Sequence, residues 1–223
     1  MGSGDLTREK IKRTAETLFA ERGFNAVSIR DIVEAADQRN SGALHYYFRT
    51  KEALARELVA DGVQRIDEDR NKRLNRLEAQ GGPKTIREVI ELLAYPYVVD
   101  KNFMKFLSRL MQDNYGLFLE GAKGQDSGFL RVAVHVHRLL PEIPNEILLQ
   151  RFHMMIVYTA SMLALQTPGR PDDEVWTPFW NLPGARETLL DTVEGMLRQP
   201  VSAETQAALT ARHRRTRAAG SGR

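Results

Sequence analysis

AADQRNSGALHYYFRTKEAL, residues 35–54, is the stretch that decides the fold. A short helix that ends near Ala36 is followed by a tight polar turn and a second short helix. Thr50 then begins a third helix at once, because its hydroxyl can accept the free amide hydrogens of a helix start. Small and polar residues at the start of the middle helix, followed by hydroxylated aromatics and a lysine, suit contact with DNA bases and phosphates. The stretch therefore predicts a helix-turn-helix that binds DNA.

The residues before this stretch predict two more helix boundaries. Ile11, Ala15 and Phe19 recur at the spacing of one helix face. Gly23 follows this helix and suits a left-handed C-terminal cap. Residues 28–31, Ser-Ile-Arg-Asp, have the pattern of a capping box, in which the serine and the acid three residues later satisfy free amides. Together with the middle helix, these segments make a three-helix head.

The helix that Thr50 begins continues to about Ala79, where Gly81-Gly82-Pro83 stops it. Further helices are expected, and the sequence contains no convincing strand pattern. We place these later helices at about 102–120, 127–140, 145–166 and 185–198. The predicted fold class is all-α: an N-terminal helix-turn-helix domain at 1–58, a larger C-terminal helical domain at 59–199, and a basic, flexible tail at 200–223.

Composition excludes several kinds of site. The 223 residues include no cysteine, so disulfides, thiolate metal ligands and cysteine nucleophiles are absent. The longest nearly apolar run, residues 154–165, is shorter than the about 20 residues of a membrane span. The N-terminus lacks the apolar segment of a secretory signal. We therefore expect a cytoplasmic protein without a membrane partner.

Charge is unevenly distributed along the chain. Residues 1–56 hold 10 Lys and Arg against 8 Asp and Glu, residues 57–199 hold 17 against 20, and the segment from 200 onward holds 5 against 1. A basic head on an acidic body suits contact with nucleic acid at one end. The arginines of the tail could add non-specific affinity for DNA, but we interpret them as a solvated end.

These motifs together resemble the tetracycline-repressor (TetR) family of bacterial transcriptional regulators. The resemblance covers Thr7 to about Leu58 and rests on Ala20-Glu21-Arg22-Gly23-Phe24, Ser28-Ile29-Arg30-Asp31-Ile32, Leu44-His45-Tyr46-Tyr47-Phe48 and Lys51-Glu52-Ala53-Leu54. So many motifs in order are a specific signal. The chain departs from the family in its turn, where Asp37 occupies the usual glycine position and Gln38-Arg39 makes the turn slightly longer.

The resemblance implies which residues contact DNA. The start of the recognition helix would reach base edges in the major groove, and Lys51 would meet a phosphate at a helix N-terminus. The predicted DNA-binding residues are Ser28, Arg30, Arg39, Asn40, Ser41, Gly42, Ala43, His45, Tyr46, Tyr47 and Lys51. His45 could contact either a base or a phosphate. One of the two tyrosines is expected to be half buried.

The resemblance also implies a C-terminal domain that dimerises and binds a small molecule. In the family the last two long helices of each subunit form a four-helix bundle, which here corresponds to 145–166 and 185–198; the alternative is that their apolar faces pack only on their own core. Methionines and aromatic residues make adaptable apolar cavities. The candidate effector-binding residues are Phe103, Met104, Leu107, Met111, Tyr115, Phe118, Phe152, Met155 and Tyr158. They suit an apolar or aromatic effector.

The sequence thus predicts a homodimeric, ligand-responsive repressor that binds a pseudo-palindromic operator in double-stranded DNA and releases it when the effector binds. An activator or an effector-independent regulator is the alternative. A helical enzyme is a remote alternative, because the sequence shows no nucleophile–base pair and no glycine-rich phosphate loop. We predict no catalytic residue, cofactor or metal; His135 and His137 are two apart on a helix and point in nearly opposite directions.

Overall fold

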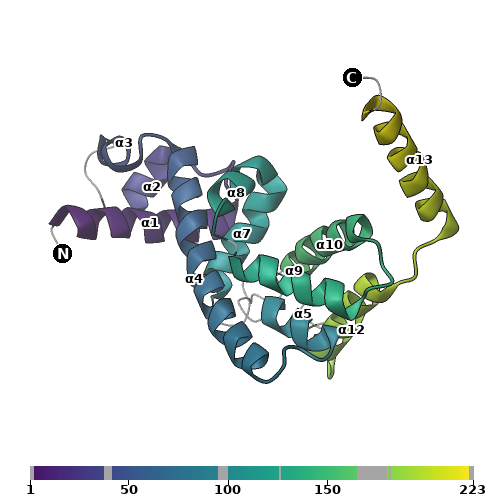
Figure 1. Cartoon of the computed structure of the whole chain (residues 1–223). Coiled ribbons are helices and arrows are strands. Elements are labelled where there is room, and N and C mark those ends of the chain that lie inside the picture. The colour runs from purple at the N-terminus through teal and green to yellow at the C-terminus, as the bar shows by residue number, and fades with distance from the viewer. Residues whose placement is uncertain are drawn as a thin grey trace.

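The computed structural model describes residues 3–37, 42–94, 100–125, 127–164, 180 and 182–220. Within these ranges the chain forms helices and turns and no strand, which confirms the all-α prediction. Along the chain the helices are α1 (Ser3–Arg22), α2 (Ile29–Ala35), α3 (Gly42–Phe48), α4 (Lys51–Ala79), α5 (Ile86–Ala94), α7 (Lys101–Asp113), α8 (Tyr115–Ala122), α9 (Ser127–Leu139), α10 (Asn145–Ala164), α12 (Ala185–Arg198) and α13 (Ala203–Gly220). Figure 1 shows that α4 runs from the head, formed by α1–α3, to α5 at the opposite end.

Two glycines let helices pack closely on α4. A Cβ atom at Gly62 would lie 2.1 Å from ring atoms of Phe103, so the absence of a side chain gives this ring its place on α4. At Gly121 of α8, a Cβ atom would lie 2.7 Å from the Cβ of Val59 and 2.9 Å from the carbonyl oxygen of Arg56. α7 and α8 therefore approach α4 more closely than a larger residue at either position would permit.

A buried carboxylate joins α4 to α9 one turn further along. Asp67 accepts hydrogen bonds from the Gly128 amide at 2.8 Å, the Ser127 hydroxyl at 2.7 Å and the Asn71 side-chain amide at 2.9 Å. It thus satisfies the free amides at the start of α9, as an N-cap residue does, but from a different helix. The contact fixes where α9 begins relative to α4.

The buried apolar side chains form two clusters that meet along α10. We call the first cluster the inner core. It consists of the buried apolar side chains of α1, α2, α3, the first part of α4, α7 and α8, with Ala160 of α10. The outer core consists of Leu74 and the buried apolar side chains of α5, α9, the rest of α10, α12 and α13. Ile156 packs against both cores. The head therefore shares one continuous core with α7 and α8.

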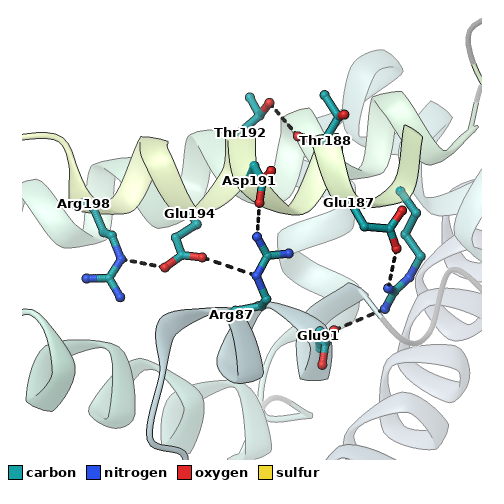
Figure 2. Close-up of polar contacts among 9 residues, drawn as sticks. Arg87, Glu91, Glu187, Thr188, Asp191, Thr192, Glu194 and Arg198 are labelled. Atoms are coloured by element: carbon teal, nitrogen blue, oxygen red, sulfur yellow. Dashed lines mark hydrogen bonds and ion pairs between the residues drawn. The ribbon is translucent and has the colours of Figure 1, made fainter. Parts of the chain in front are cut away.

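A group of charged side chains lies between α5 and α12 in the outer part of the molecule. Figure 2 shows Arg87 of α5 between two acidic residues of α12. Its guanidinium pairs with Asp191 and, at 3.7 Å, with Glu194, which also pairs with Arg198 at 2.7 Å. Ion pairs this exposed contribute little free energy. The buried leucines of α12 therefore hold the helix in place, and the charged side chains favour one orientation of α12 on α5.

Two expectations about the helices are wrong. The single helix expected at about 102–120 is two helices, because the backbone of Asn114 leaves the helical region and its side chain accepts the Leu117 amide at 3.1 Å. The expected flexible tail forms α13 over residues 203–220. Ser202 begins this helix by accepting the Thr205 amide at 3.2 Å, and Leu209 is buried in the outer core. No helix among the described residues is long and apolar enough to cross a membrane.

Candidate DNA-binding interface

The recognition helix α3 lies at the outer edge of the head (Figure 1). Phe48 is its anchor, since its ring is buried in the inner core. The two tyrosines before it differ: Tyr46 is 81% exposed, whereas Tyr47 is half buried against that core. Their rings meet edge to face at 5.0 Å. Tyr46 is therefore the tyrosine that can reach a DNA strand without any change in the packing of the core.

The N-terminus of α2 is held by the predicted capping box. The Ser28 hydroxyl accepts the Asp31 amide at 3.1 Å, and the Asp31 carboxylate accepts the Ser28 amide at 2.7 Å. The hydrogen bonds from Ser28, first from its hydroxyl and then from its amide, lower the pKa of Asp31 below its ordinary value. The cap remains formed at neutral pH because the carboxylate is ionised. Arg30, in the first turn of α2, is exposed and can approach a sugar-phosphate chain.

Lys51 has a structural contact that the sequence did not indicate. Its ammonium donates to the carbonyl oxygens of Phe24 and Val27, both at 2.9 Å, and lies 4.3 Å from the centroid of the Phe24 ring. An ammonium has three hydrogens to donate, so two are used inside the protein. Lys51 joins α4 to the α1–α2 turn, and one hydrogen is left for an outside acceptor.

Three of the predicted DNA-binding residues come together at one hollow on the head. It has a volume of about 350 Å³. Its lining residues are Ser28, Ile29, His45, Arg49, Thr50, Lys51 and Glu52. They come from the start of α2, the end of α3 and the start of α4, so two helix N-termini, the basic side chains of Arg49 and Lys51 and the imidazole of His45 surround the same space. Such an arrangement suits a phosphate group.

The sequence missed Arg49 as a member of this site. Its backbone is left-handed, with φ of 63°, which places it between α3 and α4.

The turn before α3 has a second left-handed residue, Asp37, with φ of 53°, at the position where the family has glycine. An aspartate tolerates this conformation better than most residues. Arg39, Asn40 and Ser41 lie outside the described residues, and Gly42 and Ala43 begin α3.

The candidate effector residues lie in both cores. Phe103, Met104, Leu107 and Met111 are buried in the inner core, with Tyr115 and Phe118 half buried beside them, whereas Phe152, Met155 and Tyr158 belong to the outer core. We reassign Phe103 from the pocket to the core, because its ring fills the space above Gly62 and lies 6.0 Å from the ring of Phe106. Beside the inner core, the Tyr115 hydroxyl is hydrogen-bonded to Nε2 of His153, an exposed residue of α10.

Comparison with known proteins supports the assignment of the head. Residues 11–58 match the family model of bacterial regulatory proteins of the tetR family. The HTH-type transcriptional repressor KstR2 of Mycolicibacterium smegmatis is 37% identical over 54 residues, which are 24% of this chain and 26% of that protein. The repressor of the same name from Rhodococcus jostii is 42% identical over 52 residues, 23% of this chain and 25% of that protein.

Other matches extend further along the chain. The probable HTH-type transcriptional regulator YttP of Bacillus subtilis is 26% identical over 92 residues, 41% of this chain and 44% of that protein. The chain thus spans less than half the length of these curated relatives. Salmonella enterica GusR has a TM-score of 0.54 at 18% identity, over 89% of this chain and 98% of that one. That likeness concerns the fold alone.

The head is a helix-turn-helix domain of the DNA-binding class. Residues 11–58 of this domain match the TetR family of bacterial regulatory proteins, as its motifs predicted.

Proposed function

We propose that this protein regulates transcription by binding a pseudo-palindromic operator as a homodimer. The observation that carries the proposal is the head itself: α3 is exposed at the edge of the molecule, between two helix N-termini and basic side chains that suit the flanking phosphates. Phosphate contacts of this kind position a recognition helix, and its outward side chains then meet base edges in the major groove. The named relatives are transcriptional repressors and a probable regulator.

The homodimer is proposed from an apolar face on α10. Leu149 and Met154 are each 63% exposed and Val157 is 40% exposed. With 3.6 residues per helical turn, residues 149, 157 and 154 fall within an arc of about 140° on one side of α10. A second copy of the chain would cover this face by a two-fold arrangement. α12 lies beside α10 and would complete the interface.

The effector is proposed to bind where the two cores meet, beside the Tyr115–His153 contact. Phe118 is the candidate beside this contact, with its ring 5.6 Å from that of Tyr115. Met111 belongs to the inner core and Tyr158 packs against the outer core. A small, apolar ligand there would change how the outer core packs on the inner core, which includes the head. Coupling of about 1–3 kcal/mol is typical of such linked sites, and it would release the operator. This makes the protein a ligand-responsive repressor.

Selection of bound fragments from a random DNA pool, at about 150 mM salt, tests DNA recognition directly. We expect one inverted-repeat motif with half-sites about one helical turn apart. Recovery of no motif, with binding that disappears on modest addition of salt, would leave non-specific charge attraction and refute the proposal.

The oligomeric state tests the second part. Leu149→Glu should convert the dimer to a monomer in light scattering, because it places a charge on the apolar face of α10. Leu130→Glu is the matched control: Leu130 is 58% exposed on a different helix, α9. A dimer that survives Leu149→Glu as well as it survives Leu130→Glu would place the interface elsewhere.

A further inference from the structure

His45 is held in one orientation on the exposed side of α3. It follows Gly42 by three residues, so it lies on the same helix face as the start of the recognition helix. Its Nδ1 atom is 2.7 Å from the carbonyl oxygen of Arg49. The left-handed backbone of Arg49 ends α3 and places this carbonyl between α3 and α4. The ring therefore does not turn freely, although the side chain is exposed.

The contact determines which hydrogen-bonding group the ring offers to DNA. A carbonyl oxygen only accepts hydrogen bonds, so Nδ1 must carry the hydrogen. A neutral imidazole has one N–H, and its other nitrogen is then an acceptor. The outward atom, Nε2, thus presents a lone pair when the ring is neutral. Phosphate oxygens donate no hydrogen, so a neutral His45 has nothing to offer a phosphate.

We infer that His45 is a specificity-determining residue that accepts a hydrogen bond from the exocyclic amino group of an adenine or a cytosine in the major groove. These are the base groups that donate there, through N6 of adenine and N4 of cytosine. Guanine and thymine present acceptors at the corresponding positions and would face Nε2 lone pair to lone pair. The inference rests on the proposed DNA-binding function. From the sequence alone His45 could contact either a base or a phosphate, and the inference assigns it to a base.

The neighbouring charges support this division of roles. Arg49 and Lys51 line the same hollow and carry hydrogens for phosphate oxygens, while Glu52 is the acidic member. The Ser28 hydroxyl donates to Asp31, so that carboxylate is already engaged within α2. Phosphate contacts are therefore available from the basic side chains and the helix N-termini. His45 is left for the base edge.

The test removes the amino group and the imidazole separately. In the selected operator, each adenine is replaced in turn by purine, and each cytosine by an analogue without the N4 amino group, at pH 8. The wild-type protein should lose affinity on the order of tenfold at one position in each half-site. His45→Ala should be indifferent to that replacement. His45→Gln, whose amide oxygen can accept, should regain part of the discrimination.

Tyr46→Ala is the matched control, since Tyr46 is the exposed neighbour on α3. It should lower the affinity for every operator variant alike and keep the position-specific loss. If His45→Ala instead weakens every operator variant equally and flattens the salt dependence, His45 contacts a phosphate and the inference is overturned. The same follows if no single amino-group removal affects the wild-type protein. Failure of the wild-type protein to select any motif would instead refute the proposed function.

Discussion

The inner and outer cores differ in what fills them. Both cores are built mainly from aliphatic side chains, but the inner core holds several buried phenylalanines, whereas Phe152 is the buried phenylalanine among the described members of the outer core. The buried phenylalanines of the inner core are Phe19, Phe24, Phe48, Phe103 and Phe106. Rings bury more surface per side chain and prefer defined relative orientations. The inner core is therefore the part of the molecule that fixes geometry.

That geometry includes the head. Phe19 of α1 stacks on Phe106 of α7 with centroids 5.8 Å apart and planes at 27°. The Asp113 carboxylate at the end of α7 accepts the Phe24 amide at 2.8 Å. A domain boundary at residue 58 crosses this core, so the head should move with α7 and α8. The outer core instead leaves apolar side chains of α10 exposed, as a surface for a partner requires.

The sharpest way to break the inner core is Gly62→Ala. The new methyl group would overlap the Phe103 ring, so the ring and α7 must shift. We expect the free energy of unfolding to fall by about 3 kcal/mol, at the upper end for overpacking. Chemical denaturation monitored by circular dichroism measures it. Operator affinity should fall as well, because α7 carries the head.

Gly116→Ala provides the matched control on α8. Its methyl group would meet the Asn114 side chain at an ordinary 3.6 Å, and a helix favours alanine over glycine. This variant should be neutral or slightly stabilising. Equal destabilisation by both substitutions would mean that the close approach of Phe103 to α4 does not determine the stability of the inner core.

The junction between α4 and α9 gives the next largest effect. Asp67→Ala leaves the Gly128 amide buried without its acceptor, which should lower the free energy of unfolding by about 2 kcal/mol. Asp69→Ala is the control: this carboxylate is 47% exposed and pairs with Arg73 one turn away, so its loss should cost less than about 0.5 kcal/mol. If the two variants unfold at the same denaturant concentration, the tertiary cap is not stabilising.

Local signals account for what the sequence predicted well. The capping box at Ser28 and the length of α4 depend on residues within one turn of each boundary. The break at Asn114 was missed because the helical pattern is apolar on both sides of it. α13 was missed because arginine was interpreted as a sign of solvation, although Ser202 and the following alanines favour a helix.

Long-range contacts account for what the sequence could not predict. The close approach at Gly62 depends on a residue more than thirty positions away in the printed sequence. The contact of Lys51 with two carbonyls likewise depends on how the α1–α2 turn folds over α4. Within the site, Ser28, His45 and Lys51, each predicted from the motif to contact DNA, line one hollow. It did not indicate which of their hydrogens the protein itself uses.

Lys51→Ala separates the two roles of this residue and has the smallest expected effect on stability. Loss of the two carbonyl contacts should lower the free energy of unfolding by about 1 kcal/mol, because the ammonium is partly solvated. If the remaining hydrogen meets a phosphate, binding should weaken for all DNA sequences alike and the salt slope should flatten by about one unit. Lys51→Arg is the control that retains the charge. A loss of stability without any change in salt slope would show that Lys51 acts within the head alone, and that Arg49 and the helix N-termini bear the phosphate contacts of the hollow.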